Sequence, residues 1–163
     1  MDAPFSTRLS EDQHRRCASG LFNGAWTLLE STERTPAQSE EMVHAAHASR
    51  WHWGVVGRPV NCARGEWLIS RVYAVLGKGV QAREHADRCL AMCDEHGLGE
   101  FDRAFAHEAI ARAASIQQDA QEVADHVQYG LAAAAQVVED RDRDWVIRNL
   151  GTVTSDPPMT EPS

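Results

Sequence analysis

The stretch WLISRVYAVLGKGVQAREHADRCL, residues 67–90, gives the main indication of the fold, because it contains two helical segments separated by Gly77-Lys78-Gly79. The tripeptide directly follows a turn of apolar residues, and glycine readily adopts the backbone conformation that ends a helix. We therefore expect one helix over about 59–76 and a second over about 80–96. Because the break between them is so short, the two helices are expected to form an antiparallel hairpin.

Helix-capping residues and glycines also divide the rest of the chain into helical segments. Ser10 with Gln13 and Thr35 with Gln38 fit the capping box, in which a hydroxyl caps an amide of the first turn and a side chain three residues on reaches back. Glycines mark further stops. The remaining expected helices cover about 11–30, 36–53, 100–117 and 120–138, with a short segment near 140–150.

Length and composition fit one helical-repeat domain over residues 1–150, followed by a disordered tail over 151–163. A chain of 163 residues is long enough to bury a real core. Alanine is frequent, whereas clusters of β-branched residues and the dipeptides of hairpin turns are absent. The tail is polar and rich in proline. These features favour close-packed helices over any substantial sheet.

The charge balance and the cysteines limit the classes of partner. The chain has 24 Asp and Glu against 16 Lys and Arg, a formal net charge of -8, so its surface field repels nucleic acid. No apolar run approaches the roughly 20 residues that cross a bilayer, and the N-terminus lacks the apolar core of a signal peptide. Four cysteines without CxxC spacing are expected to be reduced thiols. We therefore expect a cytoplasmic protein with no nucleic-acid or membrane partner.

A weak internal repeat relates this hairpin to the next pair of helices. Identical residues lie 41 positions apart: Arg71 and Arg112, His85 and His126, Leu90 and Leu131, Ala91 and Ala132. Repeats of about 34–45 residues built from two antiparallel helices are typical of helical solenoids. In such folds each hairpin buries its apolar face against the next one.

Residues 67–90 resemble a tetratricopeptide repeat (TPR). Tyr73, Gly77 and Ala82 occupy the positions of the motif's aromatic residue, its turn glycine and the small residue at which paired helices touch. The resemblance covers mainly residues 59–138, and the order of segments also resembles a group of small bacterial helical proteins. It implies an all-α fold of antiparallel helical hairpins, stacked as a short right-handed TPR-like solenoid. It implies no activity.

The TPR resemblance further implies a concave groove lined by the first helix of each hairpin. The polar side chains expected there are partly cationic, and the arginine fork binds carboxylate or phosphate through paired hydrogen bonds. We therefore expect the groove to bind a peptide or a small acidic ligand. The candidate ligand-binding residues are Asn61, Arg64, Arg71, Glu108 and Arg112, with Trp51 in the same groove. Alternatively, the arginines form ion pairs with Glu66, Asp102 or Glu108 that lock adjacent helices.

Histidines of the helix 36–53 are the candidate metal ligands. His44 and His47 lie on one face of that helix, and a metal ion would need a further ligand from another helix, for which Glu66 and His85 are candidates. Two imidazoles with a carboxylate form the ligand set of zinc or non-haem iron sites. Alternatively, the histidines flank a packed alanine stripe and hydrogen-bond to neighbours. Apart from Zn or Fe, no cofactor is expected.

Familiar catalytic patterns are absent from the sequence, which lacks a GxSxG elbow, glycine-rich phosphate loops and HExxH. The repeat favours a TPR-like binding or scaffold protein with a protein or peptide partner. A homodimer is a further expectation, because the last helix, with Trp145 and Leu150, either caps the stack or self-associates. The alternative is a metal-dependent enzyme or metal-binding protein with its site on the helix 36–53.

Overall fold

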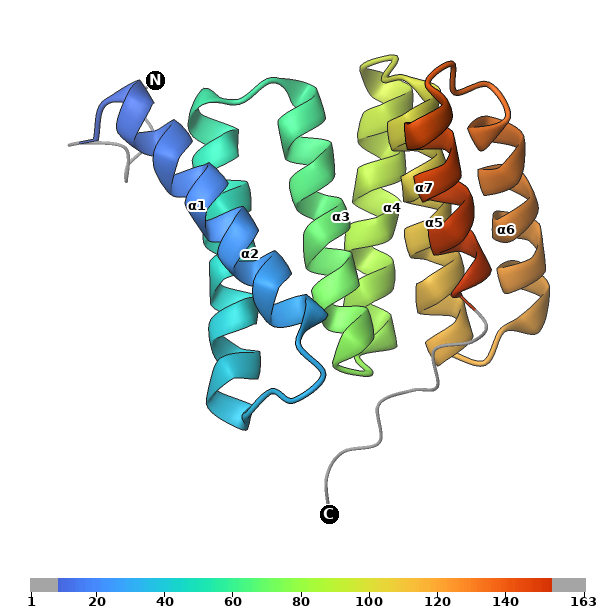
Figure 1. Ribbon diagram of the computed structural model, residues 1–163, viewed down its shortest axis with the longest axis horizontal. Coiled ribbons are helices and arrows are strands. Elements are labelled where there is room, and N and C mark those ends of the chain that lie inside the picture. Colours follow the sequence, from blue (N-terminus) through green and yellow to red (C-terminus); the bar gives the residue numbers. More distant parts are fainter. Residues whose placement is uncertain (1–8, 154–163) are drawn as a thin grey trace.

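A computed structural model describes residues 9–153, which form seven α-helices and no strand within that range (Figure 1). The predicted all-α class is therefore confirmed. The helices are α1 (Glu11–Glu30), α2 (Pro36–Val56), α3 (Pro59–Val75), α4 (Gly79–Glu95), α5 (Glu100–Ile116), α6 (Ala120–Ala134) and α7 (Asp140–Gly151).

The predicted starts and stops are formed by the local interactions that the sequence indicates. Both capping boxes are present: Gln13 N donates to Ser10 Oγ, Ser10 N donates to Gln13 Oε1 at 2.7 Å, and Thr35 with Gln38 repeats the arrangement. Gly77 ends the turn after α3 with a φ of 70°. A side chain is strained in that conformation, which explains the glycine.

Two predicted boundaries are wrong by a few residues. The second helix continues to Val56, past the predicted end at 53, and α6 ends at Ala134 instead of 138. Beyond α6 the chain turns back, since Val137 N donates to Ala134 O and Val137 is buried. Of the predicted disordered tail, residues 151–153 belong to the fold, because Gly151 ends α7 and Val153 is buried. The remainder of that tail lies outside the described residues.

Helices that follow one another in sequence also lie side by side (Figure 1). They alternate in direction, with α1 crossing α2 obliquely. The helices α3 and α5 have the most neighbours, since α3 contacts α1, α2, α4 and α5, and α5 contacts α3, α4, α6 and α7. The two helices α3 and α5 consequently form the centre of the molecule.

Small residues allow these helices to approach closely. A Cβ atom on Gly65 would lie 2.7 Å from Arg50 Cδ, so α2 and α3 touch there. Alanines fill most of the buried positions of α5. The largest fully buried apolar side chains are Met42, Leu68, Ile69 and Ile110. The core is thus built from many small contacts around a few large aliphatic groups.

None of the described helices combines the length and apolar character needed to cross a membrane.

Candidate functional site

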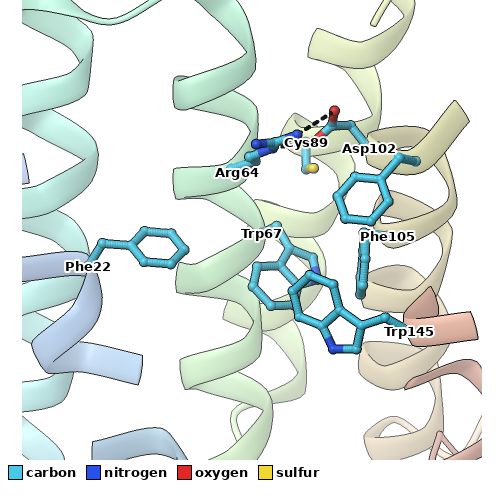
Figure 2. A pocket seen from close by; sticks show the side chains of 8 residues that line it. Phe22, Arg64, Trp67, Cys89, Asp102, Phe105 and Trp145 are labelled. Atoms are coloured by element: carbon cyan, nitrogen blue, oxygen red, sulfur yellow. Dashed lines mark hydrogen bonds and ion pairs between the residues drawn. The ribbon is translucent and has the colours of Figure 1, made fainter. Parts of the chain in front are cut away.

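A cavity of about 220 Å³ opens between α1, α3, α4, α5 and α7 (Figure 2). We call it the aromatic pocket, because five of its lining side chains are aromatic. It is lined by Phe22, Arg64, Trp67, Cys89, Phe101, Asp102, Phe105 and Trp145. Four helices supply the rings, so the pocket exists only once those helices have packed together.

The walls of the pocket are held by contacts between rings. Phe101 and Phe105 are four residues apart on α5, so they lie on one face of that helix, with their centroids 5.1 Å apart. The ring of Phe105 also meets Trp67 at 5.3 Å and Trp145 at 5.1 Å, both edge to face. Outside the pocket, Trp26 stacks on Trp67 at 5.6 Å. These contacts favour a preformed cavity.

One side of the pocket is charged. Arg64 Nε and Nη2 donate to the two carboxylate oxygens of Asp102 at 2.6 and 3.1 Å. The hydrogen bond to Asp102 raises the pKa of Arg64. The Arg64 side chain is 51% exposed and that of Asp102 is 11% exposed. Figure 2 shows this pair at one end of the pocket and Trp145 at the other.

A buried ion-pair cluster lies behind the pocket. Glu108, which is fully buried, accepts hydrogen bonds from Trp67 Nε1 at 3.0 Å, Arg71 Nη1 at 3.2 Å and Arg112 Nε at 2.7 Å. Arg112 also donates to Asn149 O and to Thr152 Oγ1, which attaches α7 to α5. For Arg71, Glu108 and Arg112 the structure therefore shows the helix-locking ion pairs that the sequence left as the alternative.

The other predicted ligand-binding residues are spread over the molecule. Arg64 lines the aromatic pocket, although its carboxylate partner is Asp102. Asn61 caps α3, since its Oδ1 accepts from Arg58 N at 2.9 Å. Trp51 lies next to His14 and His52, with ring centroids 5.7 and 5.0 Å away, and does not line the pocket. The six candidates thus do not form one groove surface.

Three of the four predicted metal ligands do gather. His85 Nδ1 lies 2.7 Å from Glu66 Oε2, and the His47 ring lies 5.3 Å from that of His85. His44 is exposed on α2. Arg50 Nε donates to the second oxygen of Glu66 at 2.8 Å. Within residues 9–153 no group of three or more His, Cys, Asp or Glu side chains has an arrangement that could hold a metal ion.

The electrostatics of this cluster follow from those contacts. Burial alone would raise the pKa of Glu66, but the hydrogen bond with His85 and the charge of Arg50 outweigh it and lower the pKa. Burial lowers the pKa of His47, and the neighbouring His85 lowers it further. The Glu66 carboxylate is therefore ionised and shared between Arg50 and His85. A zinc or iron role for these residues stays a prediction.

The internal repeat is visible in the contacts of the histidines. His107 and His126 lie 41 residues beyond Glu66 and His85, and their Nδ1 atoms are 3.0 Å apart. A neutral histidine pair on α5 and α6 thus replaces the carboxylate and histidine on α3 and α4. Burial, followed by the charge of His126, lowers the pKa of His107 to about 4.

This lowered pKa predicts a loss of stability in acid. The pKa of His107 is lower in the folded protein than the value of 6.5 in the unfolded chain, so the unfolded chain takes up the proton first. The contribution of neutral His107 to the free energy of unfolding is therefore fully present above pH 6.5 and is lost as the pH falls toward 4. We expect urea unfolding to show a smaller fall in stability between pH 7 and pH 5 for His107→Gln than for the wild type. His96→Gln, at an exposed histidine, serves as control. An equal fall in all three proteins would refute the assignment.

For most residues of the aromatic pocket, no sequence pattern indicates that they line a cavity. The spacing of Phe101 and Phe105, and that of Arg64 and Trp67, places each pair on one helical face. No local pattern indicates that these two faces meet each other, or that Phe22 and Trp145 close the space between them.

The arrangement of the pocket is suited to binding. Its walls are apolar, one side carries a charged pair, and the only thiol among its lining residues belongs to Cys89. A hydrogen bond with Cys93, together with burial, raises the pKa of Cys89 well above its usual value, so the group is a thiol and a weak nucleophile. In comparisons with known proteins, no family model, no curated protein and no solved structure matches this chain.

Proposed function

We propose that this protein is a binding protein, whose aromatic pocket holds an apolar group of ring size from a small molecule or a peptide. The observation that carries the proposal is the cavity of about 220 Å³ with five aromatic walls. An enclosed apolar cavity of about 150 Å³ is enough to bind benzene. The pocket therefore has room for one aromatic ring and the first atoms of its substituent.

The fold that we propose for this role is a short TPR-like stack of the hairpins α1 with α2, α3 with α4, and α5 with α6. Two observations support it. The contact between Glu66 and His85 in the second hairpin has a counterpart between His107 and His126 in the third, 41 residues further along the chain. The two residues of each contact are 19 positions apart. Helices from successive hairpins also line the pocket together. Such a stack suits a scaffold that holds a peptide partner between its repeats.

The alternative of a zinc or iron site has less support. The Glu66 carboxylate, which would be the anionic ligand, already pairs with Arg50 and His85. A metal ion would have to displace both partners of a group that is 5% exposed. The aromatic pocket, by contrast, can take a ligand without breaking a contact.

A fluorinated probe tests the pocket. We expect 4-fluorotoluene to bind the wild-type protein saturably, as followed by the ¹⁹F shift of the probe. Trp145→Ala removes one aromatic wall and is expected to weaken binding by about 3- to 10-fold, the usual worth of one aromatic contact. Ile147→Ala is the matched control, because Ile147 is on the same helix and is 42% exposed against 40% for Trp145, yet does not line the pocket. Non-saturable binding, or equal weakening by both variants, would contradict the proposal.

A further inference from the structure

We infer that the ligand of the aromatic pocket is a free amino acid with an aromatic side chain, whose carboxylate binds Arg64 and whose ammonium group binds Asp102. This inference rests on the proposed function and names the ligand class of the same site. It follows from the position of one ion pair at the edge of an otherwise apolar cavity (Figure 2).

Both members of the pair keep capacity for a ligand. The guanidinium uses Nε and Nη2 on Asp102, and Nη1 has no hydrogen-bond partner among the described residues. Each Asp102 oxygen accepts one hydrogen bond from Arg64, whereas a carboxylate offers about four acceptor sites. A ligand can therefore bind both groups while Arg64 and Asp102 remain paired.

The charge of the pair selects the charge of the ligand. Arg64 and Asp102 form a strong local dipole, with Nε and Oδ1 2.6 Å apart, and the charge of Asp142 also acts on Arg64 from nearby. A ligand with a single charge satisfies one group and is repelled by the other. An amino acid carries an ammonium and a carboxylate on one carbon, so it presents a dipole complementary to that of the pair. An internal peptide residue lacks both charges, and the ends of a peptide separate them.

The apolar walls select the side chain of the ligand. Arg64 lies over the Phe101 ring, with its Cζ 5.6 Å from the ring centroid, so the charged end of the pocket is continuous with an aromatic wall. A carboxylate on Arg64 places the substituent of the same carbon against Trp67, Phe101 and Phe105. Edge-to-face contacts favour a ring there over an aliphatic group.

Four probes that share one fluorophenyl group test the inference by ¹⁹F titration of the full chain. They are 4-fluoro-L-phenylalanine, 3-(4-fluorophenyl)propionate, 2-(4-fluorophenyl)ethylamine and 4-fluorotoluene. The amino acid is expected to bind at least about tenfold more tightly than either singly charged probe, because each charge-assisted hydrogen bond is worth about that factor. If 4-fluorotoluene binds but the amino acid binds no better than the propionate or the amine, the inference fails and the proposed function stands. If no probe binds, both fail.

Two variants test which pocket residue binds each charged group of the ligand. Arg64→Gln is expected to weaken the amino acid and the propionate by about tenfold more than it weakens 4-fluorotoluene. Asp102→Asn is expected to weaken the amino acid and the amine in the same way. A cooperative urea-unfolding transition shows that each variant is folded. Arg83→Gln, which breaks the ion pair with Glu122 outside the pocket, is the control. Wild-type affinity of Arg64→Gln and Asp102→Asn for the amino acid would overturn the inference.

Discussion

Replacing Glu108 with Gln is expected to lower the free energy of unfolding by about 3–5 kcal/mol, the usual cost of removing one partner from a buried ion pair. The Glu108 carboxylate is fully buried and accepts from two arginines and from the indole of Trp67. Glutamine keeps the size of the side chain but removes its charge. Arg112, with 7% of its side chain exposed, would then lose its buried counter-charge.

Urea unfolding at pH 7 measures this effect, with the change read from the midpoint at constant slope. Glu100→Gln is the matched control, since Glu100 is also on α5 but its side chain is 42% exposed and lies 3.7 Å from Arg103. We expect the control to change stability by no more than about 0.5 kcal/mol. Equal losses in the two variants would show that the buried cluster contributes nothing beyond a surface ion pair.

Truncation of Leu68 is expected to have the second large effect, with Leu68→Ala costing about 2–5 kcal/mol. Leu68 is fully buried on α3, the helix that contacts α1, α2, α4 and α5. A cavity there is bordered by several helices, so no single helix can move to fill it. Because the substitution removes buried apolar surface and no charge, the loss of unfolding free energy should be independent of salt, unlike the loss caused by breaking a surface ion pair.

The same unfolding measurement checks this prediction. Val80→Ala provides the comparison, because Val80 is 70% exposed and loses little burial on truncation. We expect a change within about 0.5 kcal/mol for that variant. A cost below about 1 kcal/mol for Leu68→Ala would mean that α3 is not the centre of the core.

The extent to which the site could be predicted differs between its parts. The residue type of Arg64 and its position on a helix predict a binding role, and an ion pair between Arg64 and Asp102 is one of the alternatives that the sequence leaves open. Of the four candidate metal ligands His44, His47, Glu66 and His85, the last three lie close together, whereas His44 is exposed. Their use as metal ligands depends on how many lone pairs of the Glu66 carboxylate remain free. Arg50 occupies one of them by donating to Glu66 Oε1. No helical spacing shows that Arg50 reaches Glu66 from the neighbouring helix.

Local interactions within the sequence were enough to predict most helix boundaries, except the C-terminal ends of α2 and α6. Ser10, Thr35 and Gly77 act through hydrogen bonds and backbone angles within a few residues, and such local interactions can be derived without knowing the fold. The faces that meet between helices depend on long-range packing. Trp67 and Glu108 are 41 residues apart, and their contact depends on the rotation and crossing of α3 and α5. The aromatic pocket arises from that packing, because its walls come from helices that have no local interaction with one another.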